Sequence, residues 1–213
     1  ASGLIYRGFY AVPPFLRSPK GVLTNAVFGF ANILFTILTT QKPDYLAVAY
    51  DKRGPTFRHK AFEAYKATRV KAPQELYDQI PIVKDLVATF GIPGFEADGF
   101  EADDVLATMI KKLKDQTDLQ ILVATGDFDM FQLVSPNVWI LYPAKGFREA
   151  EIFKPDQVKE KYGLTPEQVP DYKGLAGDSS DNIPGVRGIG DKGATSLLQK
   201  YGIRTALDFA RKN

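Results

Sequence analysis

The order of apolar and polar positions predicts alternating helices and strands over roughly the first 150 residues. Apolar residues recur at helical spacing in three segments, and short uninterrupted apolar runs of the kind found in buried strands occur in three others. The expected helices are 25–40, 74–90 and 102–113, and the expected strands are 46–50, 121–124 and 138–141. Thr24 has the chemistry of an N-cap for the first helix, and Trp139 in the last strand is expected in the core. Alternation of this kind predicts an α/β fold with a mostly parallel central sheet flanked by helices.

The pattern becomes helical from about residue 155 onward. Helices are expected at 155–162, 166–175, 192–201 and 205–211, joined by turns that contain Gly or Pro. We therefore expect an α/β body over residues 1–153 and an attached helical lobe over residues 154–213.

The composition is that of a globular protein without membrane-spanning segments or disulfides. Of the 213 residues, 45% are hydrophobic and 24% are charged, as in ordinary globular proteins. No segment approaches the roughly 20 apolar residues that span a bilayer, and the first residues do not have the pattern of a signal peptide. The chain contains no cysteine, which excludes disulfides and thiolate metal sites and suits a cytoplasmic protein. Any metal must therefore be held by oxygen ligands.

Eight carboxylates form four tight groups beside predicted elements, and the groups after strands lie where parallel sheets gather ligands. They are Asp51; Glu101, Asp103 and Asp104; Asp127 and Asp129; Asp178 and Asp181. Each group alone has a structural explanation as a helix cap or a turn. Together, so many like charges would repel one another unless hard cations neutralised them. Two Mg²⁺ or Mn²⁺ ions about 4 Å apart, hydrolysing a phosphodiester, match this chemistry.

Spacing within the groups predicts orientation. On a helix, Glu101 and Asp104 share a face while Asp103 lies to one side. Asp127 and Asp129 point the same way if the backbone stays extended as it leaves the preceding strand.

A basic stretch runs from Lys52 to Lys71, with seven cationic residues against the single acid Glu63. Helical spacing there would place Phe62, Lys66 and Arg69 on one face, with Tyr65 beside it. Aromatic and cationic groups together can stack on bases and contact phosphates of single-stranded nucleic acid. The alternative is a solvated surface helix.

A glycine-rich turn, GVRGIGDKGA, precedes the helix that contains Lys192. Gly185, Gly188 and Gly190 allow close backbone approach, and N–H groups at a helix start can hold a phosphate. This favours a sequence-independent grip on a duplex backbone, with a plain helix connection as the alternative.

The motifs YRGFYAVPP, TNAVFGF, AVAYDKRGPTFRH, YKATR, GFEADDV, TGDFDM, GDSSDNIPGV and GIGDK occur in this order. In this the chain resembles the 5′ nuclease domain of bacterial DNA polymerase I, a flap-endonuclease-like family. The resemblance implies a PIN-like fold with a helical arch over about 52–80 and a helix-hairpin-helix-type turn over about 182–201. It also implies structure-selective, metal-dependent 5′-3′ exonuclease and flap endonuclease activity on DNA with a 5′ flap, nick or branched end, in primer removal and repair.

The same resemblance implies roles for the acidic groups. The three acids of GFEADDV, with Asp51 adjoining, would hold the first metal ion, and the two aspartates of TGDFDM would connect the ions. Asp178 and Asp181 would complete the second cluster.

The resemblance further implies that Lys66 and Arg69 act in catalysis by steering the scissile phosphate, with Arg58 and Tyr65 on the same arch. The turn from Gly185 to Lys192 would contact duplex DNA and hold a K⁺ ion through carbonyl oxygens.

Two departures from the family bear on activity. Its members begin with a strand that ends in an aspartate just before the position of Ala1, and their nuclease domain continues past the position of Asn213. Because of these departures, we expect a fragment of a longer protein that can include a polymerase domain. We also expect a monomer. The rival hypotheses are a DNA-binding module with an incomplete metal site and a PIN-like ribonuclease.

Overall fold

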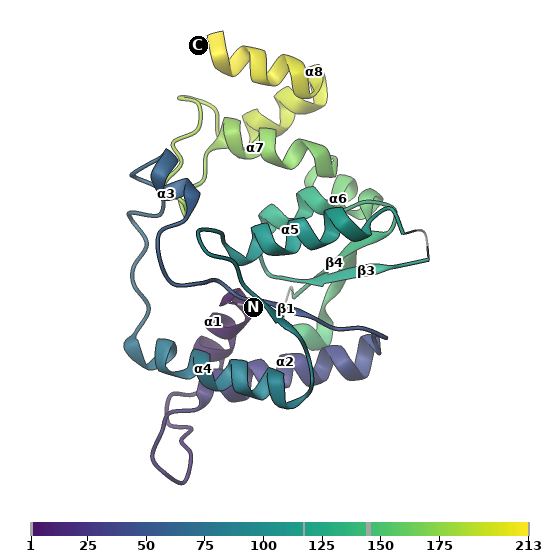
Figure 1. The fold of residues 1–213 in the computed structure, drawn as a ribbon. Helices are drawn as coiled ribbons and strands as arrows, with labels where there is room; N and C mark the ends of the chain where they lie inside the picture. The colour runs from purple at the N-terminus through teal and green to yellow at the C-terminus, as the bar shows by residue number, and fades with distance from the viewer. Residues whose placement is uncertain (1, 117, 144–145, 213) are drawn as a thin grey trace. The chain divides into compact units, whose positions relative to one another are not determined.

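A computed structural model describes residues 2–116, 118–143 and 146–212, which form two compact units (Figure 1). Unit 1 comprises Ala1–Thr56, Lys71–Met109 and Tyr142–Glu151. Unit 2 comprises Phe57–Val70, Ile110–Leu141 and Ile152–Asn213. Each unit therefore combines segments that are far apart in the sequence.

Two closely packed helices, α1 (Ser2–Ala11) and α2 (Asn25–Gln41), form much of unit 1. They meet at Gly8 and Gly29, where a Cβ added to Gly29 would lie 2.4 Å from Gly8 Cα. Only glycine permits this backbone approach. Helix α2 confirms the predicted helix at 25–40, whereas α1 was not predicted.

The N-terminus of α2 is capped from a distant part of the sequence. Gln79 on α4 (Gln74–Thr89) accepts a hydrogen bond at Oε1 from Ala26 N–H (2.8 Å). Its Nε2 donates to Asn25 Oδ1 (3.0 Å), and both side chains are buried. The hydroxyl of Thr24 instead donates to the carbonyl of Leu16. The predicted capping role of Thr24 is wrong because a long-range partner takes the N–H group that a cap would satisfy.

Unit 1 also contains a short parallel ladder between β1 (Val48–Ala49) and β2 (Gly94–Phe95). Strand β1 is shorter than the predicted 46–50, and β2 was not predicted. The core beneath is formed by apolar side chains from the helices and from Tyr50. Its buried members are Ile5, Ala26, Phe30, Leu34, Tyr50, Val83 and Val87. Helix α5 (Ala102–Leu113), which begins in unit 1, confirms the predicted helix 102–113.

A second sheet has the order β3-β4-β5, formed by β3 (Ile121–Ala124), β4 (Val138–Tyr142) and β5 (Glu151–Phe153). Strands β3 and β4 are parallel, which confirms the predicted pairing mode. Between them runs the 3-10 helix η1 (Phe128–Leu133), and η2 (Phe147–Glu149) precedes β5.

The tryptophan of β4 does not belong to the core. Trp139 is only partly buried, its indole N–H donates to the Pro136 carbonyl (3.1 Å), and the Lys154 ammonium lies 4.1 Å from its ring centroid. The expectation that Trp139 is a core residue was wrong. Burial along β4 alternates at this point, and its neighbours Val138 and Ile140 face the core instead.

The helices of unit 2 follow the predicted lobe with two differences. Helix α6 spans Pro155–Tyr162 as expected, but the predicted helix 166–175 is divided into η3 (Pro166–Gln168) and α7 (Val169–Ala176). Helix α8 spans Asp191–Lys212 and contains a non-helical residue, Gly202, between the two predicted helices. The lobe has a small core of Leu164, Leu175, Ala194 and Leu198.

No helix within the described ranges combines the length and apolar character needed to cross a membrane. The short helix α3 (Phe57–Ala61) belongs to unit 2 and is considered with the site.

Candidate metal centre and its flanking cations

The first acidic group, in unit 1, is built on the start of α5. Asp51 follows β1 and its Oδ1 accepts a hydrogen bond from Ala102 N–H (2.7 Å). Asp104 Oδ2 accepts from Glu101 N–H (2.9 Å), which turns this carboxylate back over the first helical turn. Asp103 is partly buried on the same turn. The structure thus brings Asp51 to the GFEADDV acids, although they are separated by about fifty positions in sequence.

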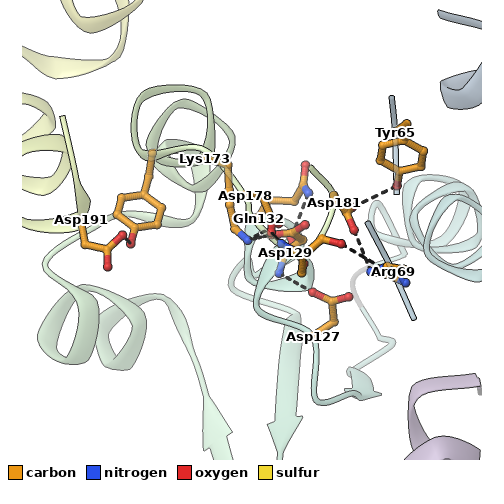
Figure 2. A network of polar contacts seen from close by, with 11 residues as sticks. Tyr65, Arg69, Asp127, Asp129, Gln132, Lys173, Asp178, Asp181 and Asp191 are labelled. Carbon is orange, nitrogen blue, oxygen red and sulfur yellow. Dashed lines mark hydrogen bonds and ion pairs between the residues drawn. The ribbon is translucent and has the colours of Figure 1, made fainter. Parts of the chain in front are cut away.

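The second acidic group, in unit 2, brings together Asp129, Asp178 and Asp181. A carboxylate oxygen from each lies within 4.8 Å of the others (Figure 2). Such spacing allows one cation to contact several carboxylates, and an all-oxygen set suits a hard divalent ion. The donor set therefore fits a divalent metal ion without histidine or cysteine.

Asp127 lies near this group but has a different local role. Its backbone is extended, and its Oδ1 accepts a hydrogen bond from Asp129 N–H (2.9 Å), so it caps η1. The chain turns into η1 immediately after Asp127 and does not stay extended. The prediction that Asp127 and Asp129 point the same way required an extended backbone, and it fails because η1 already begins at Phe128, between the two aspartates.

A tight loop holds Asp178 and Asp181 in place. Asp178 and Ile183 exchange two backbone hydrogen bonds, each 2.8 Å long. At the base of the loop, a Cβ on Gly185 would lie 2.5 Å from Gly177 N, and both glycines have positive φ. Only glycine satisfies both the close approach and the left-handed backbone. The sequence GDSSDNIPG thus forms a closed loop that presents its two aspartates.

Lys173 on α7 joins the acidic group as an internal cation. Its Nζ lies 2.7 Å from Asp178 Oδ2 and 3.0 Å from Asp129 Oδ1. The other oxygen of Asp178, Oδ1, accepts hydrogen bonds from Ser180 N–H (2.9 Å) and from the Ser180 hydroxyl (2.7 Å). Both oxygens of the Asp178 carboxylate are therefore engaged.

These contacts set the protonation of the group. Burial alone would raise the pKa of Asp178, but the Lys173 ammonium and the hydrogen bonds from Ser180 lower it to about 2. Burial raises the pKa of Asp129, opposed by Lys173 and reinforced by neighbouring carboxylates. Burial would lower the pKa of Lys173, but its two carboxylate partners raise it. At neutral pH the lysine is therefore charged and Asp178 is ionised.

The basic segment of unit 2 is not the predicted helix. Helix α3 ends at Ala61, residues 63–68 form turns, and Lys66 has a positive φ of 58°. The predicted shared face of Phe62, Lys66 and Arg69 is therefore wrong. The physical reason is a hydrogen bond from Lys66 N–H to the Asp181 carbonyl (3.0 Å). In a continuous helix the Lys66 N–H would instead donate to a carbonyl within the helix.

Side chains of the same segment contact Asp181 directly (Figure 2). The Tyr65 hydroxyl donates to Asp181 Oδ2 (3.0 Å), and Arg69 Nη2 donates to Oδ1 (2.7 Å). Arg69 Nε also donates to the Ser180 carbonyl (3.1 Å), and Asn182 Nδ2 donates to the Ala64 carbonyl (2.8 Å). We call these contacts the Asp181 clasp.

Aromatic rings lie against two further cations of the segment. The Lys66 ammonium lies 4.8 Å from the Tyr65 ring centroid, and the Arg58 guanidinium lies 4.6 Å from that of Phe57. Tyr65 itself is buried and meets His59 edge to face. His59 thus belongs to the aromatic contacts of this segment.

The glycine-rich turn also lies in unit 2, before α8. Gly185 and Gly188 have positive φ, while Gly190 accepts at its carbonyl from Ala194 N–H (2.9 Å). Lys192 is exposed in the first turn of α8, beside Asp191, which accepts a hydrogen bond from the Tyr172 hydroxyl (2.9 Å). These positions are compatible with a phosphate grip; their role in DNA binding stays a prediction.

Sequence reasoning missed Lys173. This lysine belongs to no acidic group, although it lies in the motif DYKGLAGDSSD, five positions before Asp178. A cation placed about one helical turn before an acidic loop is the signal that could have found it.

Comparison with known families assigns the fold. The family described as 5′-3′ exonuclease, N-terminal resolvase-like domain, matches residues 1–163, and the family described as 5′-3′ exonuclease, C-terminal SAM fold, matches residues 164–208. The α/β units and helical lobe are thus a resolvase-like nuclease fold followed by a small helical domain. The chain belongs to the 5′-3′ exonuclease family.

Relatives of this chain include both long and short proteins. It is 45% identical over 201 residues to DNA polymerase I from Bacillus caldotenax, covering 94% of this chain and 23% of that protein. It is 41% identical over 201 residues to a 5′-3′ exonuclease from Aquifex aeolicus, covering 94% of this chain and 68% of that protein. The chain therefore spans about a quarter of the length of its DNA polymerase I relatives.

Solved structures share the fold at low sequence identity. The 5′-exonuclease of T5 with bound zinc ions aligns with a TM-score of 0.74 at 22% identity, covering 97% of this chain and 75% of that one. Flap endonuclease-1 from Methanococcus jannaschii aligns with a TM-score of 0.61 at 20% identity, covering 100% of this chain and 72% of that one. These likenesses confirm the PIN-like fold class.

Proposed function

We propose that this chain is a structure-selective 5′-3′ exonuclease and 5′-flap endonuclease that hydrolyses DNA phosphodiester bonds with divalent metal ions. The observation that carries the proposal is the acidic group of unit 2, with three aspartate carboxylates within 4.8 Å of one another in a chain of the 5′-3′ exonuclease family. A relative named 5′-3′ exonuclease and a phage flap endonuclease solved with DNA and metal ions support it.

We assign the metal ligands to both acidic groups, each within its own unit. Asp51, Glu101, Asp103 and Asp104 would hold metal in unit 1, and Asp127, Asp129, Asp178 and Asp181 would do so in unit 2. When bound, such ions would activate a water as the nucleophile and neutralise charge on the phosphate. We propose Mg²⁺ or Mn²⁺, two or more ions, because carboxylate oxygens are the preferred donors of hard cations.

The chain's cations bind the substrate. We propose that Lys66 and Arg69 contact the scissile phosphate, since both lie within the segment that reaches Asp181. Arginine can present two N–H groups to one phosphate, which fixes its orientation. Arg58 would contact the single-stranded 5′ end through its charge. Tyr65, whose ring is buried, would support DNA binding indirectly by holding Lys66 and Asp181 in place instead of stacking on a base.

The glycine-rich turn holds the duplex in this proposal. Backbone N–H groups near Gly185, Gly188 and Gly190, with the ammonium of Lys192, would bind phosphates without reading sequence. A K⁺ ion held by carbonyl oxygens of the same turn would add positive charge beside the duplex.

The proposal extends to the organisation of the protein. We divide it into a nuclease body over residues 1–153, with an arch over about 52–80, and a helical lobe over residues 154–213. The partners are DNA with a 5′ flap, nick or branched end and, as in the DNA polymerase I relatives, a polymerase domain. We further propose a monomer that acts in the cytoplasm in primer removal and repair.

Cleavage of a labelled 5′-flap DNA tests the function directly. We expect product with Mg²⁺ and none with EDTA. Asp178→Asn should abolish cleavage while leaving flap binding largely intact, because it removes a ligand charge and not a phosphate contact. Asp115→Asn, which changes an exposed acid outside both acidic groups, is the charge-matched control and should cleave normally.

Three outcomes would count against the proposal. Flap binding without Mg²⁺-dependent cleavage would identify a DNA-binding module instead. Faster cleavage of an RNA flap on an RNA duplex than of the matched DNA would identify a ribonuclease. Full activity of Asp178→Asn would contradict its assignment as a metal ligand.

A further inference from the structure

Lys173 is the one cation within the described residues that contacts two carboxylates of the unit 2 group. Its Nζ bridges Asp178 Oδ2 (2.7 Å) and Asp129 Oδ1 (3.0 Å), and the side chain is 27% exposed. The ammonium also lies 5.7 Å from the ring centroid of Phe128, the residue between Asp127 and Asp129. Lys173, on helix α7, therefore contacts two separate segments of the chain, and both segments carry proposed metal ligands.

We propose that Lys173 is a resident counter-ion that positions Asp129 and Asp178 at ligand spacing before a divalent ion binds. This inference rests on the proposed function, because it concerns the same metal group. Without an internal cation, Asp129, Asp178 and Asp181 would repel one another in the metal-free protein and separate. Lys173 prevents this by ion pairing with two of them.

The two cations of the group differ in how they are held. Arg69 pairs with Asp181 only, and its side chain is 52% exposed. Lys173 pairs with two carboxylates and is more enclosed. Arg69 could therefore rotate away and leave Asp181 free to hold a divalent ion, whereas Lys173 would stay paired with Asp129 and Asp178.

A retained lysine has two opposite effects on metal binding. It keeps the carboxylates in position, which favours a productive geometry, but its positive charge repels the incoming ion. Removing it should therefore strengthen metal binding and weaken catalysis at saturating metal. A residue that merely stabilised the fold would leave the half-saturating Mg²⁺ concentration unchanged.

The test compares Lys173→Met with Lys159→Met, the same change at an exposed lysine of α6 in the same unit. Two quantities are measured against Mg²⁺ concentration: the thermal midpoint and the single-turnover rate of flap cleavage. For Lys173→Met we expect a lower midpoint without divalent ions, a larger Mg²⁺-induced rise and a half-saturating concentration about tenfold lower. The plateau rate should also fall, and Lys159→Met should match the wild type in all four respects.

Lys173→Arg and Lys173→Gln keep the inference testable if Lys173→Met fails to fold. Arginine retains the charge, so its half-saturating concentration should stay within about threefold of the wild type, while glutamine should show the lowered value. Equal or higher half-saturating concentrations in both neutral variants would overturn the inference. A wild type that neither responds to Mg²⁺ nor cleaves would instead refute the proposed function.

Discussion

Replacing Gly29 with alanine tests whether the contact between α1 and α2 determines the stability of unit 1. On helix propensity alone the change should stabilise the protein, since alanine is favoured over glycine by about 1 kcal/mol in a helix interior. The structure predicts the opposite sign. The added Cβ would lie 2.4 Å from Gly8 Cα, 2.7 Å from Gly8 O and 2.8 Å from Gly8 C.

The magnitude follows from these distances. Ordinary contact begins near 3.4 Å, so the helices must separate by 3.4 − 2.4 = 1.0 Å at this point. The opposing atoms are backbone, so no side-chain rotation relieves the clash. Overpacking costs typically 1–3 kcal/mol, and a backbone contact belongs near the upper end, about 3 kcal/mol. After the propensity gain, we expect a net loss of about 2 kcal/mol.

Urea unfolding followed by circular dichroism at 222 nm measures this loss. With a slope of about 2 kcal/mol per molar urea, the midpoint should fall by about 1 M. Gly174→Ala on α7 is the matched control, because an added Cβ there meets nothing within 4 Å. It should leave the midpoint unchanged or raise it.

An unfolding midpoint for Gly29→Ala at or above that of the wild type would refute the reasoning. It would mean that α1 can move away from α2 without loss of packing. A fall in Gly174→Ala equal to that in Gly29→Ala would also refute it, because the effect would then not arise from the helix contact.

Two further predictions concern unit 1. Gln79→Leu removes the acceptor of the Ala26 N–H and the donor to buried Asn25, so urea unfolding should show a fall of about 2–4 kcal/mol in the free energy of unfolding. Gln74→Ala, at an exposed position of the same helix, is the control and should change it little. An unchanged unfolding midpoint for Gln79→Leu would contradict the capping role of Gln79. Burial, reinforced by Glu96, raises the pKa of Tyr50 to about 12, so the folded state resists ionisation and its stability should fall between about pH 10, the unfolded value, and pH 12. Tyr50→Phe should remove this part of the loss of stability at alkaline pH, measured by unfolding at several pH values, and should remove one late step from the absorbance titration at 295 nm. At pH 8 the change should cost little stability, because the buried Tyr50 hydroxyl has no hydrogen-bond partner in the described structure. An alkaline stability profile equal to that of the wild type would contradict the raised pKa.

Elements with a regular apolar period could be predicted from the sequence. Helix α2 and strand β3 match their predicted ranges closely, because burial of one face or of the whole strand dictates their residue pattern. Helix α1 escaped prediction because its packing depends on Gly8, a residue that lowers helix propensity and gives no apolar signal.

Features that depend on distant partners could not be read from local patterns. The cap of α2 comes from Gln79, and the backbone of Lys66 is turned by a hydrogen bond to Asp181. In both cases a tertiary contact replaced the local preference that the sequence suggested.

The candidate site shows the same division. The grouping of Asp178 with Asp181 follows from a short loop and was predicted, and the approach of Asp129 follows from the shared fold of unit 2. The bridging role of Lys173 was not, because a salt bridge between α7 and η1 has no local signature.

The Asp181 clasp changes what a substitution of Arg69 measures. Because Arg69 holds Asp181 Oδ1 at 2.7 Å, removing the guanidinium frees a carboxylate oxygen as well as deleting a proposed phosphate contact. Cleavage rates of an Arg69 variant at one fixed Mg²⁺ concentration would therefore combine two opposing changes. Cleavage by Arg69→Ala should therefore be measured over a full range of Mg²⁺ concentrations and compared with cleavage by Tyr65→Phe, which also frees an oxygen of Asp181 but keeps the Arg69 guanidinium. The comparison separates the effect of losing a phosphate contact from the effect on metal binding.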